Sequence, residues 1–236
     1  MSAKTVIALD GPAGSGKSTV AGVIADRLGY VHADSGAIYR TLTLAYMERL
    51  GAGATAAAFG ESVAASGIAP GGLGCRVELR EGRQVSFIDG ADGADDVVGD
   101  RIRTREVTER IRFIADDPRC REEVNRLLRS FADWSALVVD GRDIGTVVFP
   151  ETPYKFFLDA SALVRATRRR GELLDRGLEA APVETLAAEI ERRDEQDRNR
   201  PIGALQQAED AILIDTSELE IEAVVQRVLG HLQHLF

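Results

Sequence analysis

The chain has 236 residues, 44% of them hydrophobic, and a formal net charge of −9. This composition predicts a globular protein, either one large domain or a core with a smaller insert. The acidic balance argues against a general nucleic-acid binder, and no apolar run approaches the roughly 20 residues that span a bilayer. The first residues pass straight into a strand without room for a signal peptide, so we expect a cytoplasmic protein.

A nucleotide-binding motif follows the first apolar run, which covers residues 5–10. Glycines permit a loop whose amides point inward and hold phosphate oxygens, and a helix is expected to begin directly after it. Lys17 would reach the outer phosphates of a nucleotide, and Ser18 would ligate magnesium. The alternative is a glycine-rich turn that matches by chance. The predicted triphosphate site comprises Gly11, Pro12, Ala13, Gly14, Ser15, Gly16, Lys17, Ser18 and Thr19.

Apolar residues at helical spacing predict helices over 18–28 and 36–50, with a short strand at 30–33 between them. We expect no chemical role for His32 in that strand. Ser35 and Arg40 come directly after it and could face the phosphate loop, because strand ends meet at one crevice in a doubly wound sheet. The alternative is a helix cap followed by a surface arginine.

The next region predicts a small subdomain that carries a hairpin. A weak alanine-rich helix is expected near 56–65, and alternating residues predict strands at 75–79 and 84–88. The acidic, glycine-rich run from 89 to 100 is expected to be a solvated loop. Two helices should follow within 102–131, with mostly surface arginines.

Pro118 should open the second of these helices, and Trp134 after it is expected to be a packing residue. A buried strand at 137–140 then ends in Asp140. An acid at the carboxyl end of a core strand beside a phosphate loop is placed to hold magnesium through water. Arg142 and Asp143 should emerge into the same crevice.

Two arginine-dense segments point to a lid. After a strand at 154–158, Ser161 should cap a helix that carries an arginine run, and a second run follows at 192–200. Joined by a linker at 171–182, the two helices are interpreted as a hinged flap over the triphosphate, although an arginine run is usually a solvated face. A last strand at 211–215 and a closing helix complete a parallel α/β sheet covered by helices on both faces.

This combination favours a kinase. Phosphoryl transfer needs charge neutralisation and in-line positioning, and a lid excludes the water that would compete as acceptor. A signalling GTPase is the main rival. Its guanine-binding Asn-Lys-x-Asp segment is missing, because Asn125 and Asn199 are each followed by arginine.

The chain resembles the bacterial cytidylate kinases, a family of nucleoside monophosphate kinases with the phosphate-loop fold. The resemblance rests on six segments that occur in family order and span nearly the whole chain, the Asp-Gly-Arg-Asp segment being the most specific. The segments are Asp10–Ser18, Asp34–Arg40, Asp140–Pro150, Lys155–Ser161, Arg193–Arg200 and Asp210–Ser217.

The resemblance implies transfer of the γ-phosphate of ATP to CMP or dCMP with Mg²⁺. It implies a core of residues 1–50 and 133–236 with a lid at about 165–200, and an inserted acceptor-binding domain at 51–132. We expect a monomer without nucleic-acid or membrane partners.

Individual roles carry over by position. Acceptor-phosphate and lid contacts fall on Ser35, Arg40, Arg142 and Arg200, ribose contacts on Arg193 and Asp197, and cytosine contacts on Arg121 and Asp143. A carboxylate can accept from the cytosine amino group, while an arginine can donate to its carbonyl and ring nitrogen. The predicted catalytic side chains are Lys17, Arg142, Arg168, Arg193 and Arg200.

Three departures from the family pattern lie in the insert. Arg112 stands where the family usually presents a serine to the base, Leu128 stands where glutamine is common, and the stretch 89–101 is longer than usual. Either Arg112 points away or the base pocket differs. The alternatives are a kinase of a modified cytidylate or other small phosphorylated acceptor, and a nucleotide-binding regulator without turnover.

Overall fold

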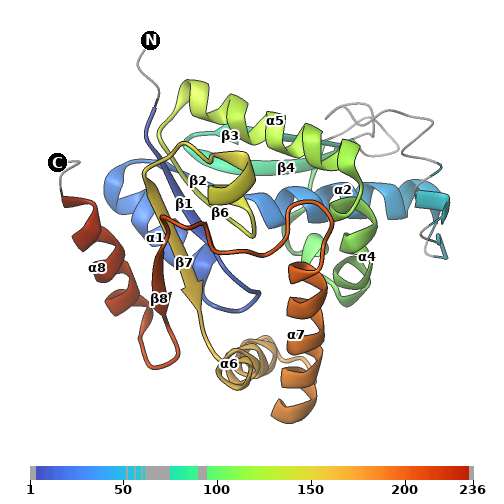
Figure 1. Ribbon diagram of the computed structural model, residues 1–236. Coiled ribbons are helices and arrows are strands. Elements are labelled where there is room, and N and C mark those ends of the chain that lie inside the picture. The colour runs from blue at the N-terminus through green and yellow to red at the C-terminus, as the bar shows by residue number, and fades with distance from the viewer. Residues whose placement is uncertain are drawn as a thin grey trace. The chain divides into compact units, whose positions relative to one another are not determined.

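The computed structural model describes residues 4–51, 53–55, 57–59, 61, 75–89 and 95–233. The chain forms two compact units, one of residues 4–32 and 136–236 and the other of residues 33–135. Figure 1 shows the elements of both units. No helix in the described ranges is long and apolar enough to cross a membrane.

A parallel sheet forms the centre of the first unit. Its middle strand β1 (Val6–Asp10) is buried at every residue and pairs in parallel with β6 (Leu137–Gly141) on one side and β7 (Tyr154–Asp159) on the other. Strand β8 (Ile212–Asp215) continues the sheet beside β7, again in parallel. The carboxyl ends of β1, β6 and β7 therefore lie next to one another, which is where ligands bind in such sheets.

Helices α1 (Lys17–Leu28) and α8 (Ile221–His231) pack together beside this sheet, as Figure 1 shows. Alternate residues of β1, Ile7 and Leu9, join the same apolar core as Ile24 of α1 and Val225 of α8. Alternation along a strand sends every second side chain to one face, so Ile7 and Leu9 pack on this layer of helices. The predicted parallel sheet with flanking helices is confirmed.

The second unit is built on α2 (Ser35–Leu50). Strand β2 (Val31–Asp34) leads into this helix, and the Asp34 side chain caps it by accepting from Ala37 N at 2.8 Å. The cap is thus Asp34 and not Ser35, which is buried. The other elements are β3 (Cys75–Arg80), β4 (Arg83–Asp89), β5 (Asp95–Val97), α4 (Arg105–Ala115) and α5 (Pro118–Trp134).

The predicted hairpin is confirmed, since β3 and β4 pair antiparallel across a two-residue turn. Residues 57–59 and 61 of the predicted alanine-rich helix are helical, and its remaining residues, like 70–74 and 90–94, lie outside the described ones. The predicted solvated loop at 89–100 is wrong in part. Residues 95–97 pair with β4 as β5, and a 3-10 helix begins at Gly99.

Two further expectations need correction. Trp134 is 81% exposed at the end of α5, so it does not pack in the described structure. The predicted lid linker at 171–182 is shorter, because α6 (Ala162–Asp175) continues before α7 (Val183–Arg198) begins. Residue propensity alone determines neither where α6 ends nor whether Trp134 is buried, because tertiary packing decides both.

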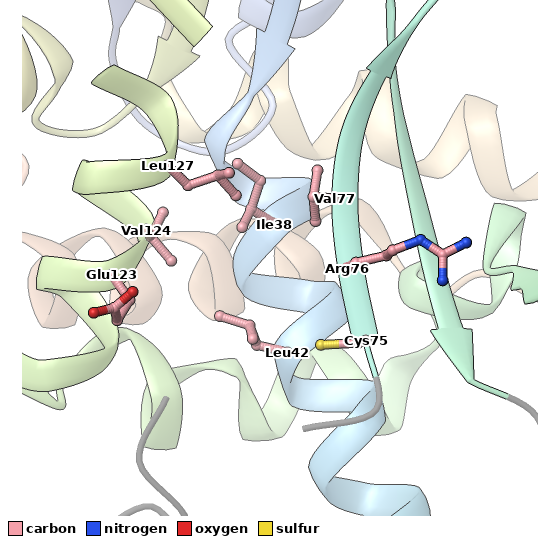
Figure 2. Close-up of a pocket in the computed structure, with 8 residues that line it drawn as sticks. All are labelled: Ile38, Leu42, Cys75, Arg76, Val77, Glu123, Val124 and Leu127. Atoms are coloured by element: carbon pink, nitrogen blue, oxygen red, sulfur yellow. The ribbon is translucent and has the colours of Figure 1, made fainter. Parts of the chain in front are cut away.

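A narrow apolar gap lies between α2, α5 and β3 in the second unit, as Figure 2 shows. Ile38, Val77 and Val124 lie on its wall, and the two charged lining residues are Arg76 and Glu123. Because its interior surface is apolar, it offers no group suited to a phosphate. We interpret it as a packing seam between α2, α5 and β3.

Candidate active site

The loop between β1 and α1 has the geometry of an anion cradle. Gly11 has φ +143°, and a Cβ there would lie 2.0 Å from Leu158 O, so only glycine fits. Gly14 and Gly16 also have positive φ, and Gly16 leads into the N-terminus of α1. A helix N-terminus that follows a loop of this kind attracts phosphate through its free amides and its dipole.

Lys17 lies over this loop. Its side chain is buried, and Nζ donates to Pro12 O at 2.5 Å and to Ser15 Oγ at 3.3 Å. Thr216 supports the loop from the end of β8 by donating from Oγ1 to Ser15 O at 3.2 Å. The ammonium group thus donates to two neutral oxygens of the loop. An anionic ligand would be a stronger acceptor than either of them.

Arg165, in the arginine run predicted to cover a triphosphate, is instead buried beneath the loop. Its guanidinium donates to Ala160 O at 2.8 Å, to Ala13 O at 3.0 Å and to Asp194 Oδ2 at 2.6 Å. These partners lie after β7, in the phosphate loop and in α7. One planar five-donor group therefore fastens α6 to both the loop and α7.

Removing this guanidinium should destabilise the protein strongly. Asp194 is 1% exposed, and its Oδ1 has no hydrogen-bond partner among the described residues. Arg165→Met would leave this carboxylate buried and uncompensated, which costs about 3 kcal/mol or more of unfolding free energy. Urea denaturation measures it, with exposed Arg170→Met on the same helix as control, expected within about 0.5 kcal/mol of wild type. Equal effects of the two variants would contradict this role of Arg165.

The carboxyl end of β6 carries the acid predicted to hold magnesium. Asp140 is buried, and its Oδ1 lies 2.7 Å from His32 Nε2, which belongs to the same unit. His32 was expected to have no chemical role, yet it pairs with this carboxylate. The pairing joins residues 108 positions apart, so no local sequence pattern indicates it.

Four side chains form a charged cluster between the end of β6 and the end of α7. Asp197 Oδ2 accepts from Arg142 Nε at 3.1 Å, and Asp197 Oδ1 lies 2.8 Å from an Arg200 nitrogen. Burial would raise the pKa of Asp197, but the charges of Arg142, Arg200 and Arg193 lower it. Burial and the neighbouring Arg142 lower the pKa of Arg193 to about 10. Arg193 and Asp197 are therefore both charged at neutral pH. Three arginines around one carboxylate give the cluster an excess of positive charge suited to phosphate.

Arg168 lies apart from this cluster. Its guanidinium donates to Thr216 O at 2.5 Å and to Thr216 Oγ1 at 3.2 Å, beside the segment that supports the phosphate loop. The structure thus brings Arg142, Arg193 and Arg200 together around Asp197 and holds Arg168 at the loop after β8. A catalytic role for Arg168 stays a prediction.

The predicted acceptor residues in residues 33–135 lie along α2 and α5. Arg40 is half-buried and donates to Ile102 O at 3.2 Å and to Thr108 Oγ1 at 2.8 Å. Arg121 is 3% exposed, donates to Ala115 O at 3.0 Å, and stands 5.6 Å from the Tyr39 ring centroid. Arg40 is therefore not the surface arginine that the alternative interpretation required. The roles of Arg40 and Arg121 toward a substrate stay predictions.

Comparison with known proteins identifies the family. The model of the cytidylate kinase family matches residues 7–234 of this chain. The chain belongs to the cytidylate kinase family. A cytidylate kinase of Shewanella loihica is 40% identical over 97% of this chain and 94% of its own length. A cytidylate kinase of Exiguobacterium sibiricum is 42% identical over 95% of both chains.

Among solved structures, an uncharacterised protein from Eubacterium ventriosum superposes with a TM-score of 0.51 at 12% identity, covering 98% of this chain and 99% of that one. At that identity the likeness shows the fold alone. Family membership makes the chain a kinase, and the resemblance read from six sequence segments is confirmed.

The departures from the family pattern acquire a structural account. Arg112 is exposed, and its guanidinium stands 5.3 Å from the Phe113 ring centroid, so it packs on its neighbour. Leu128 is fully buried and belongs to the apolar core of its unit. Of the two explanations for Arg112, this placement favours a side chain that points away.

Proposed function

We propose that this chain transfers the γ-phosphate of ATP to CMP or dCMP, giving CDP or dCDP and ADP. The observation that carries the proposal is the pairing, within one unit, of a phosphate loop bearing Lys17 with the cluster of Arg142, Arg193 and Arg200 around Asp197. Membership of the cytidylate kinase family supports the choice of acceptor.

In the proposed reaction an oxygen of the CMP phosphate attacks the γ-phosphorus of ATP. The new P–O bond forms as the bond from the γ-phosphorus to the bridging oxygen breaks, and ADP leaves with that electron pair. Lys17 and the loop amides hold the donor phosphates, and the arginines neutralise charge that spreads over the transferring group. No covalent nucleophile of the protein is required.

The residues also fit a magnesium ion, which would offset phosphate charge when bound. Mg²⁺ prefers oxygen ligands and is commonly held by one or two protein groups, waters and substrate phosphates. Ser18, in the first turn of α1, would supply a hydroxyl, and Asp140 would bind through water. His32 Nε2 contacts the Asp140 carboxylate at Oδ1 and would orient it.

The proposed acceptor contacts are those that the family resemblance implies. Ser35, Arg40 and Arg121 would contact CMP, with Arg142 on its phosphate and Asp143 on its cytosine. Asp143 is 5% exposed. A buried carboxylate favours a base that donates a hydrogen bond to it over a base that cannot. The cytosine amino group does, and the uracil carbonyl does not.

The test is coupled ADP release with ATP and Mg²⁺ against CMP, dCMP, UMP, AMP and GMP, with a control that lacks acceptor. Turnover confined to CMP and dCMP supports the proposal. A chain that binds ATP but turns over none of the five would instead be a regulator or the kinase of another acceptor. Turnover without acceptor would indicate a hydrolase.

A further inference from the structure

Asp10 has a structural position that its place in the phosphate-loop motif does not explain. It is the last residue of β1, immediately before Gly11, and its side chain is 4% exposed. Its Oδ1 accepts from Ile144 N at 2.8 Å and its Oδ2 from Gly145 N at 2.7 Å. One buried carboxylate therefore binds two consecutive amides that lie 134 and 135 positions away in the sequence.

These two amides begin the π-helical turn that follows Arg142 and Asp143. Asp143 O accepts from Val147 N at 2.9 Å within this turn, so the backbone there is fixed at both of its ends. The carboxylate thus joins the strand that starts the donor loop to the segment that carries the two proposed acceptor contacts.

The turn has little spare room at Gly145. A Cβ at Gly145 would lie 3.1 Å from Lys155 Cδ and 3.3 Å from Asp10 Oδ2. Lys155 cannot yield easily, because its Nζ donates to Pro150 O at 2.6 Å and to Asp210 Oδ2 at 2.9 Å. The backbone at Gly145 is therefore held between the carboxylate and the Lys155 stem.

The charge state of Asp10 suits this contact. Burial raises the pKa of its carboxyl to about 6, while the amides of Gly145 and Ile144 act in the opposite direction. Nearby Asp143 raises this pKa further and Lys17 lowers it. The group is mostly ionised at neutral pH, and a carboxylate accepts from both amides, which a neutral acid or an amide side chain cannot do equally.

We propose that Asp10 is a positioning residue for the acceptor, which sets Arg142 and Asp143 in register with the phosphate loop without touching a substrate. The inference rests on the proposed function and deepens it. It assigns acceptor placement to a residue of the donor strand. Loss of this contact should affect the acceptor more than ATP.

The first test is Asp10→Asn, which keeps the side-chain volume and one acceptor oxygen but turns an NH₂ group toward the second amide. The KM for CMP should rise about tenfold, as expected for one charged hydrogen bond, and the preference for CMP over UMP should fall about tenfold. The KM for ATP should change by less than about twofold. The matched control is Asp215→Asn at the end of β8, whose carboxylate accepts from Ser217 N at the surface, and it should match wild type.

A second variant keeps the inference testable if Asp10→Asn does not fold. In Gly145→Ala the added methyl group would press on Lys155 and Asp10, so the Gly145 amide should shift by a few tenths of an ångström. No charge changes in this variant. It should produce the same selective loss toward CMP, with circular dichroism and melting close to wild type.

The inference is overturned if the folded variants keep the wild-type KM for CMP and the wild-type base preference. It is also overturned if ATP and CMP parameters worsen equally, because that result indicates a general structural role. Wild-type protein assayed beside the variants shows whether the proposed function itself has failed. If it forms no ADP with CMP, the proposed function is wrong and the inference falls with it.

Discussion

Lys17→Ala should reduce phosphoryl transfer by on the order of 10⁴-fold, the scale on which a cation at the transferring phosphate contributes. Lys17 Nζ is the ammonium group placed at the phosphate loop, 2.5 Å from Pro12 O. Alanine leaves the loop glycines and the α1 dipole in place, so some ATP affinity should remain. Single-turnover transfer with saturating ATP and CMP measures the loss.

The matched control is Lys4→Ala, an exposed lysine in the same unit that precedes β1. It should leave transfer within about twofold of wild type, as most surface substitutions do. Melting curves establish that both variants are folded. A folded Lys17→Ala protein that transfers phosphate within tenfold of wild type would contradict the role given to the loop.

Asp143→Ala should abolish most of the discrimination between CMP and UMP. A substrate that leaves a buried polar group such as the Asp143 carboxylate without a hydrogen-bond donor can be disfavoured by ~10⁴-fold. The carboxylate is buried near the end of β6, where the cytosine amino group would supply its donor. The kcat/KM for CMP should fall and that for UMP should change little. The ratio of the two kcat/KM values measures the effect.

Asp143→Asn gives this prediction a sharper form. An amide can accept from cytosine through its oxygen or donate to uracil through its nitrogen, so the kcat/KM for UMP should rise above that of wild type. Thermal unfolding controls for stability. Unchanged discrimination in a folded Asp143→Ala protein would remove the base contact from the account.

Local patterns predicted most of the fold. The helices that open at Lys17 and Pro118 follow signals within a few residues, a glycine loop and an N-terminal proline. The hairpin follows from alternation around a two-residue turn. The predictions failed where tertiary packing decides the outcome. The exposure of Trp134 is an example, because it depends on which other elements pack against the end of α5.

The candidate site divides in the same way. Motif spacing indicated Lys17, and the position directly after a buried strand indicated Arg142. Asp197 was assigned by the family resemblance alone. Sequence analysis missed the supporting contacts of Asp10, His32 and Arg165, whose partners are 134, 108 and 152 positions away. These contacts join segments that are distant in the sequence and are brought together by the fold, so local patterns do not show which residues meet.

The grouping of residues 33–135 as one unit places α2 with the hairpin and with α4 and α5. We propose that this unit contributes contacts to the acceptor and that residues 4–32 and 136–236 bind ATP, with α6 and α7 as the lid. The lid would not be a free flap at its base. Arg165 of α6 fastens it to Ala13 of the phosphate loop and also binds Asp194 of α7, so movement is expected in the segment between the two helices and not at the phosphate loop.

The most direct measurement follows the γ-phosphate itself. Protein incubated with Mg²⁺ and ATP labelled at the γ-phosphate, with CMP or with UMP, is quenched and its products are separated. The account predicts label in CDP, formed in step with ADP, and little label in UDP or inorganic phosphate. Label that appears in inorganic phosphate at the same rate with and without CMP would contradict it.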